Sequence, residues 1–131
     1  MDVRTQLDLY IKNIFSFLEL EDELPKSTTE LIRNSVLLES FEKVIAEKFE
    51  KSEIESVEKL IEQQNQEALE KVIKDNKLEH DIQKQIKSQF IETLGELLIE
   101  MNANKYISDE KMNELIKVLQ NPEKQETIFP S

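Results

Sequence analysis

The chain has 131 residues, of which 38% are apolar and 34% charged, and its formal net charge is −11. Nucleic acids and anionic membranes are bound mainly through Lys and Arg, so this charge disfavours both and favours a basic protein as partner. The absence of cysteine excludes disulfides, thiolate nucleophiles and zinc–sulfur sites. One glycine and three prolines are too few for the turns of a sheet protein, which indicates long helices.

The N-terminal stretch mixes apolar and charged residues. Asp2, Asp8 and Lys12 interrupt it, whereas a signal peptide has a basic start and then an unbroken apolar core. No apolar run approaches the roughly 20 residues that span a bilayer. We therefore expect neither a signal peptide nor a membrane span, and a cytoplasmic location.

Apolar residues recur at helical spacing in six segments. The first helix is expected over residues 2–19, before the break at Pro25. The others are expected over 27–49, 54–61, 66–73, 78–101 and 109–120. The sequence thus predicts an all-α fold, a single compact bundle of five to six helices, two of them short, that ends in an αα-hairpin. Residues 1–121 are expected to form this domain and 122–131 a C-terminal tail.

The expected second helix has the widest apolar stripe, which is typical of the most buried helix. Its members are Leu31, Ile32, Val36, Leu37, Leu38, Phe41, Val44, Ile45 and Phe49. The long fifth helix contains the single glycine, Gly95. A glycine inside a helix costs about 1 kcal/mol relative to alanine, so we expect another helix to cross closely at this point.

Capping patterns mark several helix starts. Ser27 with Glu30, and Ser52 with Glu55, have the spacing of a capping box, in which each side chain accepts a backbone N–H of the other residue. Asn65 is a suitable N-cap for the fourth helix.

The loop before the last helix has the spacing of a calcium-binding loop. With Glu100 at the first ligand position of an EF-hand, Asn102 and Asn104 occupy the third and fifth. The sixth position, which needs glycine, is Lys105, and the twelfth, which needs a bidentate glutamate, is Lys111. Since both restrictive positions carry a positive charge, we expect no metal here.

The same loop is explained by helix capping. Asn102 or Asn104 can take the left-handed conformation that ends a helix. Ser108 is expected to cap the next helix, and Ile107 and Met112 stand at the positions of a hydrophobic staple. We therefore expect a structural connection between two helices.

Catalytic and cofactor sites have few candidate residues. His80 is the only histidine, and the Glu-x-x-His pattern of di-iron sites fails because residue 77 is a lysine. One glycine cannot build a phosphate-binding loop. We expect His80 on the surface in the first turn of a helix, no enzyme activity, no cofactor and no bound metal.

Two acidic clusters are candidate partner-binding sites. The first consists of Glu92, Glu96 and Glu100, at i,i+4 spacing without basic residues at that spacing; the second consists of Glu19, Glu21, Asp22 and Glu23. Both lie toward the C-terminal ends of their expected helices, where the helix dipole is already negative. They are either solvated charge, tolerated at slight cost, or the complement of a basic surface.

The last candidate is the apolar pair Ile128 and Phe129 beyond the final helix. Burying two such side chains contributes a few kcal/mol, so they either fold back on the core or form a short docking peptide.

The run FSFLELEDELPKSTTELIRNSVLLESFEKVIAEKF, followed by VEKLIEQQNQEALEKVI, resembles small acidic bacterial helical domains of unknown function. The resemblance covers about residues 15–75. It implies a style of fold, and no activity or functional residues.

These observations favour a protein–protein interaction module or an accessory subunit of a larger assembly, which docks through helix faces and acidic clusters. An alternative is an acidic decoy or inhibitor that occupies a basic or nucleic-acid-binding surface of its partner. A third, less favoured possibility is a helical bundle that binds a small apolar ligand.

Overall fold

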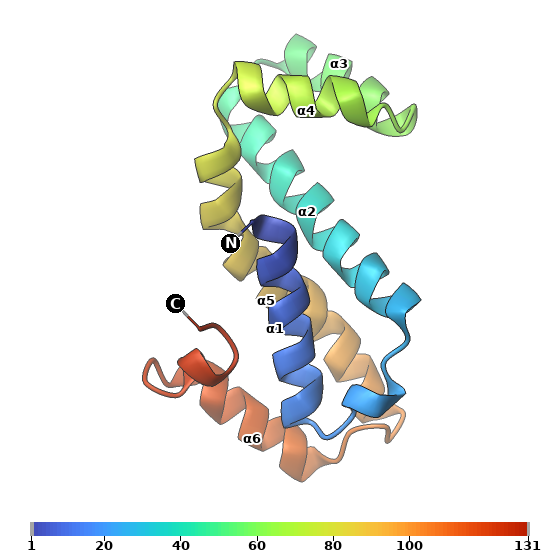
Figure 1. Ribbon diagram of the computed structural model, residues 1–131, viewed down its shortest axis with the longest axis vertical. Coiled ribbons are helices and arrows are strands. Elements are labelled where there is room, and N and C mark those ends of the chain that lie inside the picture. The colour runs from blue at the N-terminus through green and yellow to red at the C-terminus, as the bar shows by residue number, and fades with distance from the viewer. Residues whose placement is uncertain (1, 131) are drawn as a thin grey trace. The chain divides into compact units, whose positions relative to one another are not determined.

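The computed structural model describes residues 2–130, which form six α-helices, two short 3-10 helices and no strand (Figure 1). The α-helices are α1 (Val3–Phe17), α2 (Lys26–Lys48), α3 (Lys51–Glu62), α4 (Gln66–Asp75), α5 (Glu79–Ala103) and α6 (Asp109–Gln120). The 3-10 helices are η1 (Glu21–Glu23) and η2 (Gln125–Thr127). The predicted all-α class and number of helices are confirmed.

The chain packs as two compact units. Unit 1 comprises Met1–Ser35 and Phe90–Ser131, and unit 2 comprises Val36–Gln89. The long helices α2 and α5 each contribute residues to both. The segment after residue 121 is part of unit 1.

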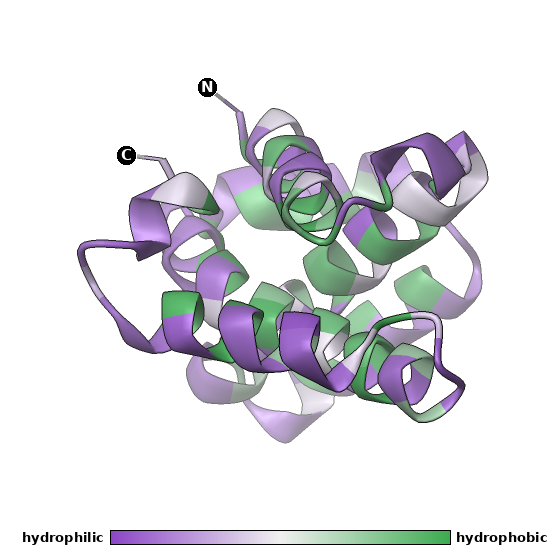
Figure 2. Cartoon of the chain, turned by 90° about the horizontal axis from the view of Figure 1, so that it is seen from below, coloured by the Kyte–Doolittle hydropathy of each residue, from purple (hydrophilic) through white to green (hydrophobic). Residues whose placement is uncertain are grey.

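Unit 1 has a core formed by α1, the second half of α5, α6 and the C-terminal segment. Its fully buried side chains include Leu7, Ile11, Ile14, Phe90, Leu94, Leu115 and Ile128. The helices bury them because each carries its apolar residues mainly on one side, as the hydropathy colouring in Figure 2 shows. The rings of Tyr10, Phe90 and Phe129 meet edge to edge or edge to face, with centroids 4.8, 5.7 and 5.9 Å apart. Such pairs contribute about 0.5–1.5 kcal/mol beyond simple burial.

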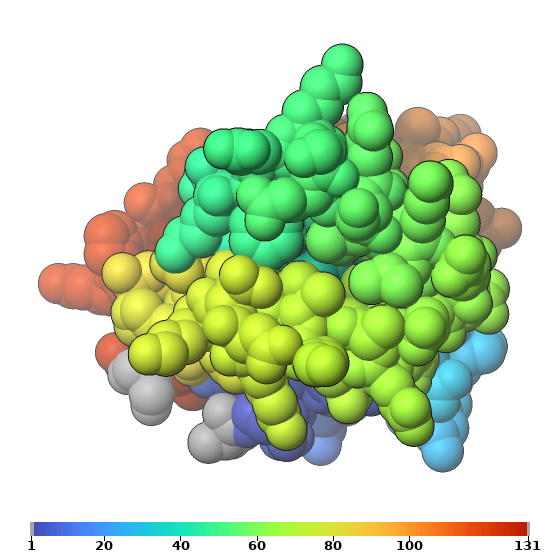
Figure 3. Space-filling model, turned by 90° about the horizontal axis from the view of Figure 1, so that it is seen from above, coloured from blue at the N-terminus to red at the C-terminus, as the bar shows by residue number. Residues whose placement is uncertain are grey.

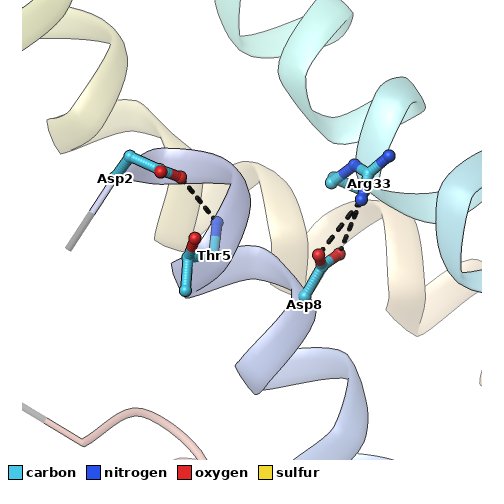
Figure 4. A network of polar contacts seen from close by, with 4 residues as sticks. All are labelled: Asp2, Thr5, Asp8 and Arg33. Atoms are coloured by element: carbon cyan, nitrogen blue, oxygen red, sulfur yellow. Dashed lines mark hydrogen bonds and ion pairs between the residues drawn. The ribbon is translucent and has the colours of Figure 1, made fainter.

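Two polar contacts involve the first half of α1 (Figure 4). The Asp2 side chain accepts a hydrogen bond from the Thr5 backbone N–H at 2.8 Å, which caps α1 and lowers the pKa of Asp2. Further along α1, both Asp8 carboxylate oxygens accept from Nη1 of Arg33, at 3.1 and 3.2 Å. The latter contact joins α1 to the start of α2.

Unit 2 contains the rest of α2, the short helices α3 and α4, and the first half of α5. Its core consists of Val36, Phe41, Val44, Ile45, Val57, Leu78, Ile82 and Ile86. Helices α3 and α4 lie side by side on its outside (Figures 1 and 3). Lys48 donates to Asp81 at 2.6 Å, which lowers the pKa of Asp81, and Gln89 Nε2 donates to Glu39 at 2.5 Å. Both contacts join α2 to α5.

The wide apolar stripe of α2 is only partly buried. Ile32, Val36, Phe41, Val44 and Ile45 are buried as expected, but Leu31 is 68% exposed and Leu38 39% exposed. These two leucines are seven residues apart, so they share one face of the helix. The prediction was wrong for this face because neighbouring helices do not enclose α2 on every side.

Two of the four N-caps predicted from the sequence are present in the structure. Asn65 accepts from the Ala68 N–H and Ser108 from the Lys111 N–H, both at 3.2 Å, as predicted. The two predicted capping boxes are wrong. Helix α2 begins at Lys26, one residue before Ser27, and Glu50 instead of Ser52 precedes α3. The Glu53 side chain accepts from the backbone N–H of Glu50 at 3.3 Å, which gives a box shifted by two residues.

Four helices end in the same way, with a non-glycine residue in the left-handed conformation. These residues are Glu19, Gln64, Lys77 and Lys105, with φ of 60, 54, 54 and 65°. The residue after each donates its N–H to a carbonyl five positions earlier, as in Leu78 to Ile73 at 3.0 Å, which is the Schellman motif. The left-handed residue after α5 is therefore Lys105, and the prediction of Asn102 or Asn104 was wrong.

Candidate interaction surface on helix α5

The second half of α5 carries the first predicted acidic cluster on its exposed side. Glu92, Glu96 and Glu100 are all exposed and follow one another at four-residue steps. Four residues advance a helix by about 6 Å, so the three carboxylates form a row along the axis. We call these three residues the acidic row.

A second row, which sequence reasoning missed, lies directly beside it. Ile91 is 38% exposed and Ile99 is 65% exposed, and Gly95 stands between them at the same four-residue spacing. We call these three residues the apolar ridge. The signal was present in the sequence as I-E-x-x-G-E-x-x-I-E, residues 91–100. Ile91 and Ile99 directly follow the buried residues Phe90 and Leu98, so they point about 100° away from the buried face.

Gly95 forms a notch in the middle of the ridge. A Cβ atom added at this position would meet nothing within 4 Å, so no helix of the chain crosses closely here. The predicted close crossing was therefore wrong. The backbone of α5 is open to approach from outside at this point, although glycine costs the helix about 1 kcal/mol.

The second acidic cluster has different surroundings. Glu19 is the left-handed residue after α1, and its carboxylate lies 3.7 Å from the ammonium of Lys111. Glu21, Asp22 and Glu23 form the separate 3-10 helix η1 and are exposed. Because α1 ends at Phe17, these charges do not extend its last turn, and the expected conflict with its dipole is reduced.

The C-terminal pair Ile128 and Phe129 is buried, with exposed fractions of 0 and 6%. The Asn13 side chain donates to the carbonyl of Ile128 at 3.0 Å, and the Phe129 ring packs on Tyr10. The pair therefore folds back on the core of unit 1. In the structure the pair does not form the exposed docking peptide that the sequence offered as an alternative. To act as one, both side chains would have to leave the core.

The loop that resembles a calcium site is organised by its own hydrogen bonds. The Asn102 amide nitrogen donates at 2.9 Å both to the carbonyl of Ile107 and to Asp109. The Asn104 amide donates to the carbonyl of Glu100 at 3.0 Å. Both side chains thus use amide N–H donors to hold the connection between α5 and α6.

The remaining candidates for a metal site are the single histidine and the acidic side chains. His80 is exposed in the first turn of α5. Among the described residues there is no group of three or more His, Cys, Asp or Glu side chains placed to hold a metal ion. Within the same range, no helix has the length and apolar character required to cross a membrane.

Comparison with known proteins adds no assignment to this geometry: no family model matches the chain, and neither a curated protein nor a solved structure is detectably similar to it. The resemblance of residues 15–75 to small acidic helical domains stays a prediction. Function must therefore be inferred from the surface itself.

Proposed function

We propose that this protein is a non-enzymatic interaction module, or an accessory subunit of a larger assembly, which binds a basic amphipathic helix of a partner protein along α5. The observation that carries the proposal is the apolar ridge of Ile91, Gly95 and Ile99 beside the acidic row. The two isoleucines and the three glutamates are exposed along the same three turns, and Gly95 is half-buried.

Apolar contact would supply most of the binding free energy. Burying a fully exposed isoleucine stabilises a complex by about 1.5–3 kcal/mol, and Ile99 is 65% exposed in the free protein. The notch at Gly95 would let a large apolar side chain of the partner reach the α5 backbone between the two isoleucines. This offers a reason for a glycine that the packing of the chain itself does not require.

The acidic row would select the partner and its orientation. Three carboxylates spaced about 6 Å apart match Lys or Arg residues repeated every four positions on a helix. Such complementarity mainly accelerates association and excludes acidic partners. A chain with a net charge of −11 would attract a basic partner over a longer range as well.

A titration with two helical peptides tests the proposal. One peptide carries leucines and lysines at four-residue spacing, and the other has glutamate in place of each lysine. Binding is followed through the NMR signals of the Ile91 and Ile99 methyl groups. We expect the basic peptide to shift both signals saturably and the acidic peptide to leave them unchanged. Equal effects of the two peptides, or no effect of the basic one, would contradict the proposal.

Two variants and a control locate the contact. Gly95→Leu fills the notch and Ile99→Gln removes part of the ridge, so each should weaken binding of the basic peptide at least several-fold. Ile116→Gln is the control, because Ile116 is an exposed apolar residue of α6, outside the ridge, with 42% exposure. The same variants, used as baits in cell extract, would distinguish a natural partner bound by the ridge from proteins captured by charge alone.

The acidic decoy remains a second candidate, since the net charge favours it as well. A decoy should compete with DNA or RNA for the natural partner, whereas an accessory subunit should bind the partner together with nucleic acid. A competition assay with the captured partner separates the two.

A further inference from the structure

Unit 2 contains a pocket that the proposed function does not use. Its volume is about 270 Å³, and residues of α2 and α3 line it. The apolar part of the lining consists of Ile45, Ala46, Ile54 and Ile61, and the remainder consists of Glu42, Glu58 and Glu62. Three carboxylates thus border an apolar floor, and no basic residue takes part in the lining.

One carboxylate of this pocket, that of Glu42, is disfavoured by its surroundings. The pKa of Glu42 is raised by partial burial first, and then by the negative charges of Glu39 and Glu58. Desolvation and like charges both disfavour a carboxylate, and the attraction of a nearby cation offsets both. Adjacent methyl groups would meanwhile contact the apolar part of the same ligand.

We propose that this pocket receives the side chain of a lysine presented by a partner protein. The apolar floor suits the four methylenes of lysine, and its ammonium has three N–H donors that can be shared among three carboxylates. Arginine suits the site less well, because its planar fork matches the two oxygens of one carboxylate. The pocket is also smaller than the roughly 300–1,000 Å³ that usually bury a whole small-molecule ligand, which favours a single side chain.

This inference does not rest on the α5 ridge. The pocket lies within unit 2, whereas the residues of the ridge belong to unit 1. It is tested without any partner protein, so the two proposals can fail separately.

The test is a titration of the intact protein with small probes, followed by the methyl NMR signals of Ala46, Ile54 and Ile61. Lysine blocked at its α-amino and carboxyl groups is the main probe. Blocked norleucine, which has a similar apolar chain without the charge, and the free diamine cadaverine are the comparisons. We expect saturable shifts with blocked lysine that decrease at high salt, and much weaker shifts with blocked norleucine.

Variants assign the binding to the carboxylates. Glu58→Gln should weaken binding of blocked lysine several-fold, whereas Glu55→Gln, an exposed position of α3 outside the pocket, should leave it unchanged. The absence of saturable shifts, or equal binding of blocked norleucine, would overturn the proposal. Stronger binding of cadaverine than of blocked lysine would overturn the protein side chain as the ligand.

Discussion

Gly95 is a glycine that the fold of the chain itself does not require. It lies inside α5, its φ is not positive, and an added Cβ would meet open space. Neither a special backbone conformation nor close packing therefore requires glycine here. The remaining cost is that of helix propensity, which alanine would avoid.

Replacing this glycine should accordingly stabilise the protein. We expect Gly95→Ala to raise the free energy of unfolding by about 1 kcal/mol, measured by urea denaturation. Ser88→Gly, at another exposed position in the interior of α5, is the matched control and should lower it. A loss of stability in Gly95→Ala would mean that another segment approaches α5 at this point.

Glu42 gives a second effect at the scale of a residue, one that depends on pH. Its pKa is raised above 4.5 because partial burial and the charges of Glu39 and Glu58 disfavour the carboxylate. The folded state therefore binds this proton more tightly than the unfolded state does. The resulting stability is complete below pH 4.5 and is lost as the pH rises through the folded pKa.

A neutral side chain at position 42 should have the stability of protonated Glu42 at every pH. We expect Glu42→Gln to unfold at higher urea concentration than the wild type at pH 7, with the difference shrinking as the pH falls through the raised folded pKa toward 4.5. Urea denaturation at a series of pH values checks this. A difference that grows toward low pH would contradict the assignment.

At the scale of the element, four helices end in a left-handed residue that is not glycine. Four C-terminal caps place side chains such as Lys77 and Lys105 in the left-handed region. In this conformation a residue with a Cβ atom has a steric free-energy cost of about 1–2 kcal/mol. Glycine has almost no steric cost there, but it loses more backbone entropy on folding. Glycine should therefore be better by a smaller net amount.

We expect Lys77→Gly to raise the free energy of unfolding by about 0.5–1 kcal/mol. Lys74→Gly is the control, since Lys74 lies within the last turn of α4 in ordinary helical conformation, and glycine there should cost about 1 kcal/mol. Thermal denaturation of both variants provides the measurement. If both substitutions shift stability in the same direction, the left-handed cap is not the cause.

At the scale of the whole molecule, the net charge of −11 produces a negative long-range electrostatic field. The acidic row adds like charges at i,i+4 spacing to a chain that already carries −11. Each repulsion costs only a few tenths of a kcal/mol, so the fold tolerates the row easily. The same charges act on a partner over about 8–10 Å at physiological ionic strength.

Replacing both Glu96 and Glu100 with glutamine should separate the effect of the acidic row on stability from its effect on association. We expect a fold that is equally or slightly more stable, a slower association with the basic helical peptide, and a weaker dependence of that rate on salt. Stopped-flow measurement of the association rate against ionic strength checks this. Identical salt curves for wild type and variant would show that the row is ordinary solvated charge.

The sequence by itself determined the all-α class, the number of helices, and most of their bounds. These features depend on local chemistry: helical spacing of apolar residues, and caps such as Asn65 and Ser108 that bond within their own turn. The acidic row could be found for the same reason, because residues four apart share a face on any helix.

Only the tertiary structure decided which apolar faces are buried and what the chain ends contact. Leu31 fits the pattern of core residues but remains exposed, and Phe129 lies outside the helices but packs on Tyr10. Periodicity gives the direction of a side chain from its helix axis, and burial depends on whether another segment lies there. Since those segments are distant in sequence, the open notch at Gly95 and the pocket between α2 and α3 became visible only in the folded chain.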